Sequence, residues 1–338
     1  MPETPASTLP APQTENAIRN ETKNAAAVSV VVPSYNHAPF IERTLRSVFR
    51  QTLPPLELVV IDDGSRDDSP RIIERVLRDC PFACEFLARE NRGLSATLNE
   101  GFARARGGRY FAYLGSDDLW FPRFLQARVE LLEARPRAVL AYGNAYSIDD
   151  ADRIIDCTTD WARYRDGDAR RMLLETLAPL SPTVLYRRDA LEAHRWNEEA
   201  VLEDYELYLR LSAEGEFAFD PAVLSAWRQH GYNASSNLEM MLREKLAAQR
   251  RVVAALNLSA KEFAEFQTLA GFRSAQEFMR RGAKLRALKL ASRNWRSAGV
   301  NGETLKLLAG LLLPHRFVAW RQERRRARAA QHYGALEI

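Results

Sequence analysis

The chain has 338 residues, 46% of them hydrophobic and 27% charged, which is enough to bury a core in one large domain or two ordinary ones. Its net charge is only +4, and its three cysteines are too few for a disulfide framework. No apolar run reaches the roughly 18 residues that a transmembrane helix needs, so the composition predicts a globular protein with reduced thiols.

The first predicted element follows an N-terminal segment rich in Pro, Thr, Asn and Ala. Residues 1–27 lack the apolar stretch of a secretory signal, which predicts a disordered tail and a cytoplasmic protein. From residue 28 to about 150, short apolar runs alternate with helical patterns. Strands are predicted over residues 28–33, 56–64, 83–90, 109–118 and 138–149, with helices over 38–51, 69–80, 93–108 and 121–135. This alternation predicts an α/β fold, a Rossmann-like and mostly parallel sheet with helices on both faces.

The pattern after residue 150 is more irregular. The predicted elements are a helix over 167–178, a strand over 182–188 and a helix over 202–215. Residues 216–237 are expected to form a strand, a turn and a second strand that leads to an ordered loop. Helices are predicted over 239–256, 260–295 and 317–330. We therefore expect a tail (1–27), an α/β domain (28–240, with halves 28–120 and 121–240) and a basic amphipathic helical extension (241–338).

Polar and acidic residues gather where three of the predicted parallel strands end. The first strand runs into Pro33-Ser34-Tyr35-Asn36, the second into Asp62-Asp63-Gly64-Ser65 and the fourth into Ser116-Asp117-Asp118. In open α/β sheets, ligands bind outside the carboxyl ends of the strands. Adjacent carboxylates repel each other and resist desolvation, so a buried core does not need them. The pattern predicts a ligand site at this edge of the sheet.

Two acid pairs and one histidine are the candidate chemical groups. Asp117 and Asp118 can hold a divalent cation, which prefers oxygen ligands and cancels their repulsion; for an isolated pair, capping of the next helix is the commoner explanation. Glu203 and Asp204 open a predicted helix, where the helix dipole favours acids, and one of them can act as a general base. His230 can supply an imidazole to the same cation, although a lone histidine is usually structural.

The signatures of several enzyme classes are missing from the sequence. It contains no G-x-G-x-x-G, no G-x-x-x-x-G-K-[ST], no G-x-S-x-G and no H-E-x-x-H. A dinucleotide dehydrogenase, a P-loop kinase and a serine hydrolase are therefore poor explanations. Asp63 can instead accept hydrogen bonds from a nucleobase or ribose, and Tyr35 can stack on a base, although an acidic turn with Gly64 explains the same residues.

An ordered set of motifs carries a resemblance to a known family. P-S-Y-N, I-D-D-G-S, N-R-G, N-E-G, S-D-D, E-D and H-G-x-N-x-S, over residues 28 to about 235, resemble the family 2 glycosyltransferases of the GT-A fold. Each motif alone is weak, but the ordered set is specific. The resemblance implies an inverting transferase that uses Mn²⁺ or Mg²⁺ and a nucleotide-diphospho-sugar, UDP or TDP first. It also implies a saccharide acceptor, polyprenyl-diphosphate-linked, in bacterial surface polysaccharide synthesis such as that of O-antigen.

The resemblance also implies roles for individual residues. The donor-binding residues are expected to be Pro33, Tyr35, Asn36, Asp63, Arg92, Asn99 and Asp117. Asp118 is the first expected metal ligand, with Asp117 and His230 as the others. Asp204 matches the general base, and Glu203 is expected to bind the acceptor or orient the site.

Two departures from the family pattern qualify these expectations. Gly115 stands where many members have the first acid of D-x-D-D, which puts the ribose and metal contacts in doubt and leaves open a catalytically inactive sugar-nucleotide-binding or scaffold protein. The Q-x-x-R-W of processive members is absent, so addition of a single sugar is expected.

The charge is divided unevenly along the chain. Residues 241–338 hold 20 Lys and Arg against 7 Asp and Glu, a net charge of +13, and the rest of the chain carries −9. A basic helical stretch with Trp295, Phe317 and Trp320 suits an anionic membrane surface and a peripheral location on the inner face of the membrane. Helices that pack on the domain explain the same pattern equally well. Nucleic acid is not an expected partner, because it leaves the acidic strand ends unexplained.

Overall fold

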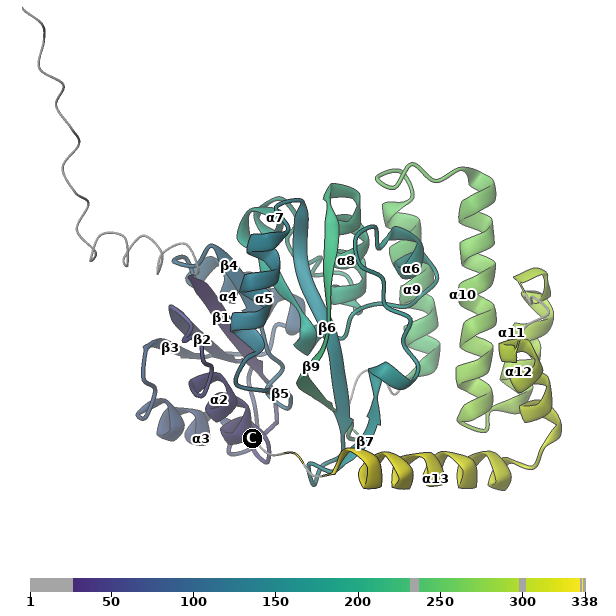
Figure 1. The fold of residues 1–338 in the computed structure, drawn as a ribbon, viewed down its shortest axis with the longest axis horizontal. Coiled ribbons are helices and arrows are strands. Elements are labelled where there is room, and N and C mark those ends of the chain that lie inside the picture. The colour runs from purple at the N-terminus through teal and green to yellow at the C-terminus, as the bar shows by residue number, and fades with distance from the viewer. Residues whose placement is uncertain (1–26, 232–236, 298–301, 335, 337–338) are drawn as a thin grey trace, which may run out of the picture.

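The computed structural model describes residues 27–231, 237–297, 302–334 and 336. Residues 1–26 of the predicted tail, and the Asn233 and Ser235 positions of the H-G-x-N-x-S motif, lie outside the described residues. Figure 1 shows an α/β domain built on one sheet, with a group of helices from the C-terminal part beside it. The predicted α/β class and the helical C-terminal part are confirmed.

The first half of the sheet is parallel. Its strands are β1 (Val28–Ser34), β2 (Glu57–Asp62), β3 (Ala83–Ala88) and β4 (Tyr110–Tyr113), in the order β3-β2-β1-β4. β1 pairs with β2 and β4 in parallel, and β2 pairs with β3 in parallel. Every residue of β1 is buried, as its continuous apolar run predicts. The carboxyl ends of β1, β2 and β4 therefore meet at one edge.

The second half of the sheet contains the longer strands. β8 (Leu185–Arg187) is antiparallel to β4 and to β6 (Ala138–Ile148), and β6 is parallel to β9 (Glu216–Arg228). Two short strands, β5 (Leu119–Trp120) and β7 (Ile154–Cys157), pair antiparallel with β9 and β6. β9 is thereby fixed in the sheet, and it leads the chain toward the edge where β4 ends.

The predicted strand, turn and strand over residues 216–237 is wrong, because β9 is one continuous strand. Its register with β6 skips Pro221 and Ala222, which form a bulge. The side-chain Nδ2 of Asn144 donates a hydrogen bond to the Pro221 carbonyl at 2.8 Å. A bulge accommodates a proline, which has no N–H to donate, without ending the strand.

Helices cover both faces of the sheet, as predicted. One face is covered by α2 (Ile41–Phe49), α3 (Ser69–Leu77) and α5 (Phe124–Ala134). The other is covered by α4 (Leu94–Arg104), α6 (Arg170–Leu174), α7 (Arg188–Ala193) and α8 (Glu203–Glu214). The helix predicted over 167–178 is thus limited to the five residues of α6.

The first helix of the C-terminal part packs on the domain. α9 (Leu238–Val252) lies against α8, and its Ala248 and Val252 belong to the same buried core. Gln249 is buried and donates hydrogen bonds to the Leu174 carbonyl at 2.9 Å and the Tyr205 hydroxyl at 3.0 Å. This helix therefore follows the packing alternative for the extension.

The remaining helices form a second, smaller core. The single helix predicted over 260–295 is divided into α10 (Ala260–Arg280) and α11 (Lys284–Arg293) by Gly282, whose φ of +82° ends a helix. These helices pack with α12 (Gly302–Leu312). α13 (His315–Tyr333) then runs back along one end of the domain to β7 (Figure 1). None of the described helices is both long and apolar enough to span a bilayer.

Candidate active site

Three side chains that can hold a metal ion meet where β1, β4 and β9 end. His37 follows β1, Asp117 follows β4 and His230 follows β9, and their ligand atoms lie within 4.8 Å of one another. His230 Nε2 is 2.9 Å from Asp117 Oδ2, and His37 Nδ1 is 3.8 Å from Asp117 Oδ1. The structure therefore brings together Asp117 and His230, two of the predicted metal-site residues, and adds His37.

His37 is the residue of this cluster that the sequence reasoning missed. It stands directly after the Pro-Ser-Tyr-Asn run at the end of β1, and that position was its only signal. Its Nδ1 lies 2.7 Å from the Ser116 hydroxyl. Burial lowers the pKa of His37 below its usual value. The imidazole is thereby kept neutral, which is the form that binds metals.

A buried arginine, Arg228, holds the acidic loop in place. Its Nε donates to the Asp117 carbonyl at 2.8 Å and its Nη1 to the Asp149 carbonyl at 2.7 Å. Its guanidinium lies 4.6 Å from the centre of the Phe40 ring, and that ring stacks on His230 at 5.5 Å. Arg228 therefore positions both Asp117 and His230, a role that the sequence reasoning also missed.

Asp118, the first expected metal ligand, points toward the end of β9. Its Oδ1 accepts a hydrogen bond from the Arg228 backbone N–H at 2.8 Å, and burial, with Asp117 nearby, raises the pKa of Asp118 well above its usual range. It does not cap the next helix, because α5 begins only at Phe124, so the capping alternative is excluded. Asp118 is not among the three clustered ligands, and its ligand role stays a prediction.

Asp63, the predicted ribose and base contact, is held by the loop that follows β3. Its Oδ1 accepts from the Arg92 N–H and its Oδ2 from the Gly93 N–H, both at 2.8 Å, and the Arg89 guanidinium also pairs with it. This carboxylate therefore fixes the Asn-Arg-Gly loop against the end of β2. These three hydrogen bonds leave at most one of the four lone-pair positions of the carboxylate for a ligand, and the donor contact stays a prediction.

The other predicted donor contacts differ in how free their side chains are. Pro33 is buried within β1, whereas the Tyr35 ring is 44% exposed beside the site. Asn36 adopts a φ of +55°, and its Oδ1 accepts from the Arg66 N–H at 2.8 Å. The strand end therefore presents Tyr35, while Asn36 shapes the turn.

Two further donor predictions lie on or before α4. The amide of Asn99 donates to the Trp196 carbonyl at 2.9 Å and accepts from the Trp196 N–H at 3.1 Å, which ties α4 to the segment before α8. The Arg92 side chain is 57% exposed, and its Nη1 lies 3.6 Å from Glu100. Arg92 is free to reach a ligand, while the Asn99 amide is engaged by the protein.

Glu203 and Asp204 form the first turn of α8, as predicted. Asp204 Oδ1 accepts a hydrogen bond from the Tyr205 N–H at 2.6 Å. The two acids therefore stand at a helix N-terminus, where the helix dipole favours negative charge. Burial raises the pKa of Asp204 to about 6 and, together with Asp204, the pKa of Glu203 to about 8. Both acids interact with Tyr113, the last residue of β4. Groups that titrate near neutrality are suited to proton transfer.

The sequence of about half of the chain is similar to a known protein family. Residues 29–195 match the model described as glycosyl transferase family 2. This part of the chain is therefore similar to glycosyl transferase family 2. An uncharacterised glycosyltransferase of Nostoc sp. is 31% identical over 169 residues, which are 49% of this chain and 52% of the relative. The chain thus spans about half the length of that relative.

Two solved structures share the fold of the α/β domain and its extension. A mannosyltransferase of Pyrobaculum calidifontis, in complex with GDP-Man and Mn²⁺, has a TM-score of 0.58 at 19% identity, over 90% of this chain and 85% of that one. TarS of S. aureus, residues 1–349 with UDP-GlcNAc, has a TM-score of 0.55 at 16% identity, over 91% of both chains. The predicted GT-A fold is confirmed, and residues 29–195 are similar to the predicted family 2 glycosyltransferases.

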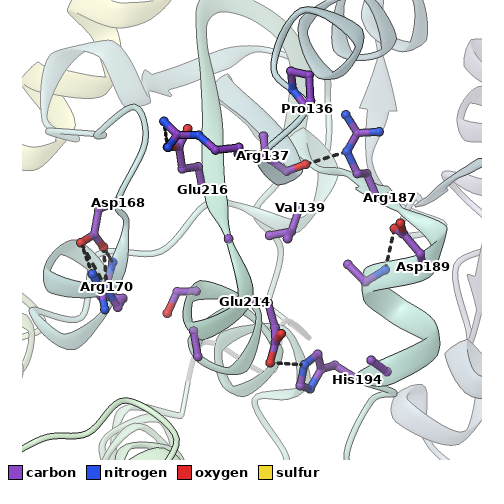
Figure 2. Close-up of a pocket in the computed structure, with 16 residues that line it drawn as sticks. Pro136, Arg137, Val139, Asp168, Arg170, Arg187, Asp189, His194, Glu214 and Glu216 are labelled. Atoms are coloured by element: carbon purple, nitrogen blue, oxygen red, sulfur yellow. Dashed lines mark hydrogen bonds and ion pairs between the residues drawn. The ribbon is translucent and has the colours of Figure 1, made fainter.

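Figure 2 shows a pocket whose lining does not include Asp117, Glu203 or Asp204. Its volume is about 750 Å³. It opens at the start of β6 and β9, roughly 30 Å along the strands from His230. Its charged lining is paired internally: His194 lies 3.1 Å from Glu214, and Arg137 lies 2.7 Å from Glu216. Volume alone therefore does not mark the ligand site of this domain.

Gly115 is the position at which the α/β domain lacks the first acid of the common pattern. A Cβ atom here would lie 3.0 Å from Asp117 Oδ1 and 3.1 Å from Asp118 Oδ2. We expect Gly115→Ala to push Asp117 away from its histidine partners and weaken Mn²⁺ binding by about tenfold, as loss of a positioning contact does. Calorimetric titration with Mn²⁺ measures this effect, with Gly107→Ala, at the other end of the strand, as the control. Equal affinity of Gly115→Ala and the parent would show that the carboxylate is not held in this place.

Proposed function

We propose that this protein is an inverting, metal-dependent glycosyltransferase that moves one sugar from a nucleotide-diphospho-sugar to a saccharide hydroxyl. The observation that carries the proposal is the cluster of His37, Asp117 and His230 at the strand-end edge of a domain that is similar to glycosyl transferase family 2. Glu203 and Asp204 interact with Tyr113, which precedes Asp117 by four residues on the same chain segment. A metal site and a pair of titratable acids thus belong to one edge of the sheet.

The donor set of the cluster favours Mn²⁺ over Mg²⁺. Two imidazoles and one carboxylate offer mixed nitrogen and oxygen ligands, and imidazole suits transition ions better than Mg²⁺. When bound, such a cation supplies charge neutralisation for the diphosphate as it leaves. The protein's own part is positional: Arg228 holds the backbone of Asp117 and the ring of Phe40, and Phe40 supports His230.

The different pKa values of Asp204 and Glu203 suggest different roles for these two acids toward the acceptor hydroxyl. With a pKa of about 6, Asp204 is a carboxylate at neutral pH and can take the proton of the attacking hydroxyl. With a pKa of about 8, Glu203 keeps its proton and can donate a hydrogen bond to the acceptor. Inversion follows when the hydroxyl attacks the anomeric carbon on the face opposite the leaving nucleoside diphosphate.

The donor and acceptor are proposed by class. UDP or TDP is the nucleotide that we test first, and the similar structure of TarS contains UDP-GlcNAc. GDP is included because the similar mannosyltransferase structure contains GDP-Man. The acceptor is a lipid-linked saccharide of bacterial surface polysaccharide synthesis. One sugar is added per event, since the sequence lacks Q-x-x-R-W.

Calorimetric titration of the full chain with UDP, TDP and GDP tests the proposal. We expect one of them to bind in the presence of Mn²⁺ and at least tenfold more weakly after chelation. The nucleotide-sugars of that base are then screened for release of the nucleoside diphosphate. Binding that ignores Mn²⁺, or no binding, would refute the mechanism, and tight binding without release from any donor would identify an inactive nucleotide-sugar-binding protein.

A further inference from the structure

Exposed large hydrophobic side chains are concentrated on and between α11, α12 and α13, the last helices of the described chain. Leu285 on α11 is 86% exposed and Leu312 on α12 is 87% exposed, which leaves both almost entirely in solvent. Nine residues make up what we call the apolar face: Leu285, Leu288, Trp295, Leu305, Leu308, Leu312, Leu313, Phe317 and Trp320. An exposed apolar area of this kind marks an interaction site more often than a chance arrangement.

α12 shows why this face is unusual for a surface helix. Leu307 and Gly310 point inward, and Gly310 leaves the space that Met279 fills. Leu305, Leu308 and Leu312 then follow at the spacing of a second stripe on the outer side. A helix whose inner stripe is already packed normally turns polar residues outward, so the outer leucines require another partner.

Positive charge is concentrated in the same part of the sequence as the apolar face. Residues 284–328 hold 12 Lys and Arg against 2 Asp and Glu. Arg316 and Arg321 are exposed and form no ion pair with the rest of the described chain. Phe317 and Trp320 lie with ring centres 5.6 Å apart, next to these cations. Exposed aromatic rings beside basic side chains are typical of a surface that meets lipid headgroups.

We propose that the apolar face and its cations bind the surface of an anionic lipid bilayer, with α11 to α13 lying in the headgroup region. A nucleic acid would use the cations but leave the leucines in water. A second copy of the chain would cover the leucines but bring two strongly basic surfaces together. An anionic bilayer satisfies both features, since acyl chains take the leucines and headgroups take the charges.

α13 joins this face to the active-site edge (Figure 1). Its Arg325 pairs with Asp156 of β7 at 2.9 Å, and its Tyr333 hydroxyl donates to Asp160 at 2.9 Å. A cavity of about 300 Å³ lies between α13, the β6–β7 turn and Gln229, the residue before His230. A membrane-bound extension would therefore hold the active site close to the bilayer. This last step rests on the proposed function, because it gives the enzyme access to a lipid-linked acceptor.

Vesicle sedimentation with the full chain tests the lipid interaction. We expect the protein to pellet with vesicles of phosphatidylcholine and phosphatidylglycerol, and to stay in solution with phosphatidylcholine alone. Leu285→Gln with Leu312→Gln should lower the partition coefficient at least tenfold, because two leucines leave the apolar region. Arg316→Gln with Arg321→Gln should lower it by about 30-fold, at roughly fivefold per cation.

Matched variants on the domain provide the controls. Leu56 is 44% exposed near β2, so Leu56→Gln should pellet like the parent, as should Arg71→Gln with Arg78→Gln on and after α3. The proposal is overturned if the parent stays in solution with anionic vesicles, or if the leucine variant pellets equally well. A parent dimer that the leucine variant dissociates, without vesicle binding, would assign the face to self-association. Sedimentation requires neither donor nor acceptor, so its failure and the failure of the proposed transfer are separate results.

Discussion

Replacement of Asp204 by Asn is expected to remove sugar transfer while leaving donor binding unchanged. The amide keeps the size of the side chain and can still accept the Tyr205 N–H that Asp204 holds at 2.6 Å, but it cannot take a proton from the acceptor. Loss of a general base costs on the order of 10²- to 10⁴-fold in rate. Release of nucleoside diphosphate measures turnover, and calorimetry with the nucleotide and Mn²⁺ measures donor binding.

Glu203→Gln is the matched comparison for this variant, since it removes the neighbouring acid of the same turn. It should keep most of the transfer at neutral pH, because Glu203 is proposed to act as a hydrogen-bond donor and the amide can also donate. If Asp204→Asn turned over normally while Glu203→Gln did not, the assignment of the base would have to be reversed. Equal, undiminished turnover of both would place the base elsewhere.

The raised pKa of Asp204 also gives this prediction a pH dependence. The carboxylate is the active form, so transfer should rise with pH through about 6 and then level off. Stability should change in the opposite sense: between the ordinary Asp value of about 4 and a pKa of about 6, the folded state binds more protons than the unfolded state, and stability falls as pH rises. Asp204→Asn should remove that loss and raise the melting temperature at pH 7.

The parallel half of the fold could be predicted because local sequence determines it. The apolar run of β1 is buried along its whole length, and the acids at the ends of β2 and β4 follow directly from where those runs stop. The bulge in β9 could not be predicted in this way. Pro221 has the local signature of a turn, and only pairing with the distant strand β6 makes the chain continue.

In the candidate site too, some residues could be predicted from the local sequence, whereas others depend on contacts with distant parts of the chain. Asp117 and His230 could be predicted because each follows a recognisable strand. Arg228 could not, because its burial and its hydrogen bonds to the Asp117 and Asp149 carbonyls depend on loops far away in the sequence. Asp118 was preferred over Asp117 as a ligand, yet one bond to the Arg228 N–H turns it toward β9.

The C-terminal part shows the packing explanation for its first helix and leaves the membrane explanation for its later helices as a proposal. α9 packs on the domain, where Arg251 pairs with Glu206 at 2.6 Å, so a deletion from residue 241 would damage the core. The later helices leave Leu285 and Leu312 in solvent. A helical pattern with apolar residues on two sides does not show which side packs against the rest of the protein. Only the structure distinguishes the packed side from the exposed side.

Asp117→Asn should produce the second large effect, a loss of Mn²⁺ affinity of about 100-fold or more, because a ligand should cost at least as much as the 10- to 100-fold of a contact that supports one. The amide preserves the shape of the side chain but removes the negative charge that lies between His37 and His230. His230→Gln should weaken Mn²⁺ binding in the same way, since it removes a ligand atom 2.9 Å from Asp117. Titration of the free Mn²⁺ signal by electron paramagnetic resonance measures both affinities without donor or acceptor.

His194→Gln is the matched control, because His194 lies 3.1 Å from Glu214 in a comparable histidine–acid pair at the other end of the strands. Its Mn²⁺ affinity should equal that of the parent. A parent-like affinity of Asp117→Asn would remove the cluster from the mechanism and return the ligand role to Asp118, for which Asp118→Asn is then the decisive variant. Loss of affinity in Asp117→Asn and His230→Gln, with His194→Gln unchanged, would instead mean that the strand-end cluster binds the metal and that Asp118 supports it through Arg228.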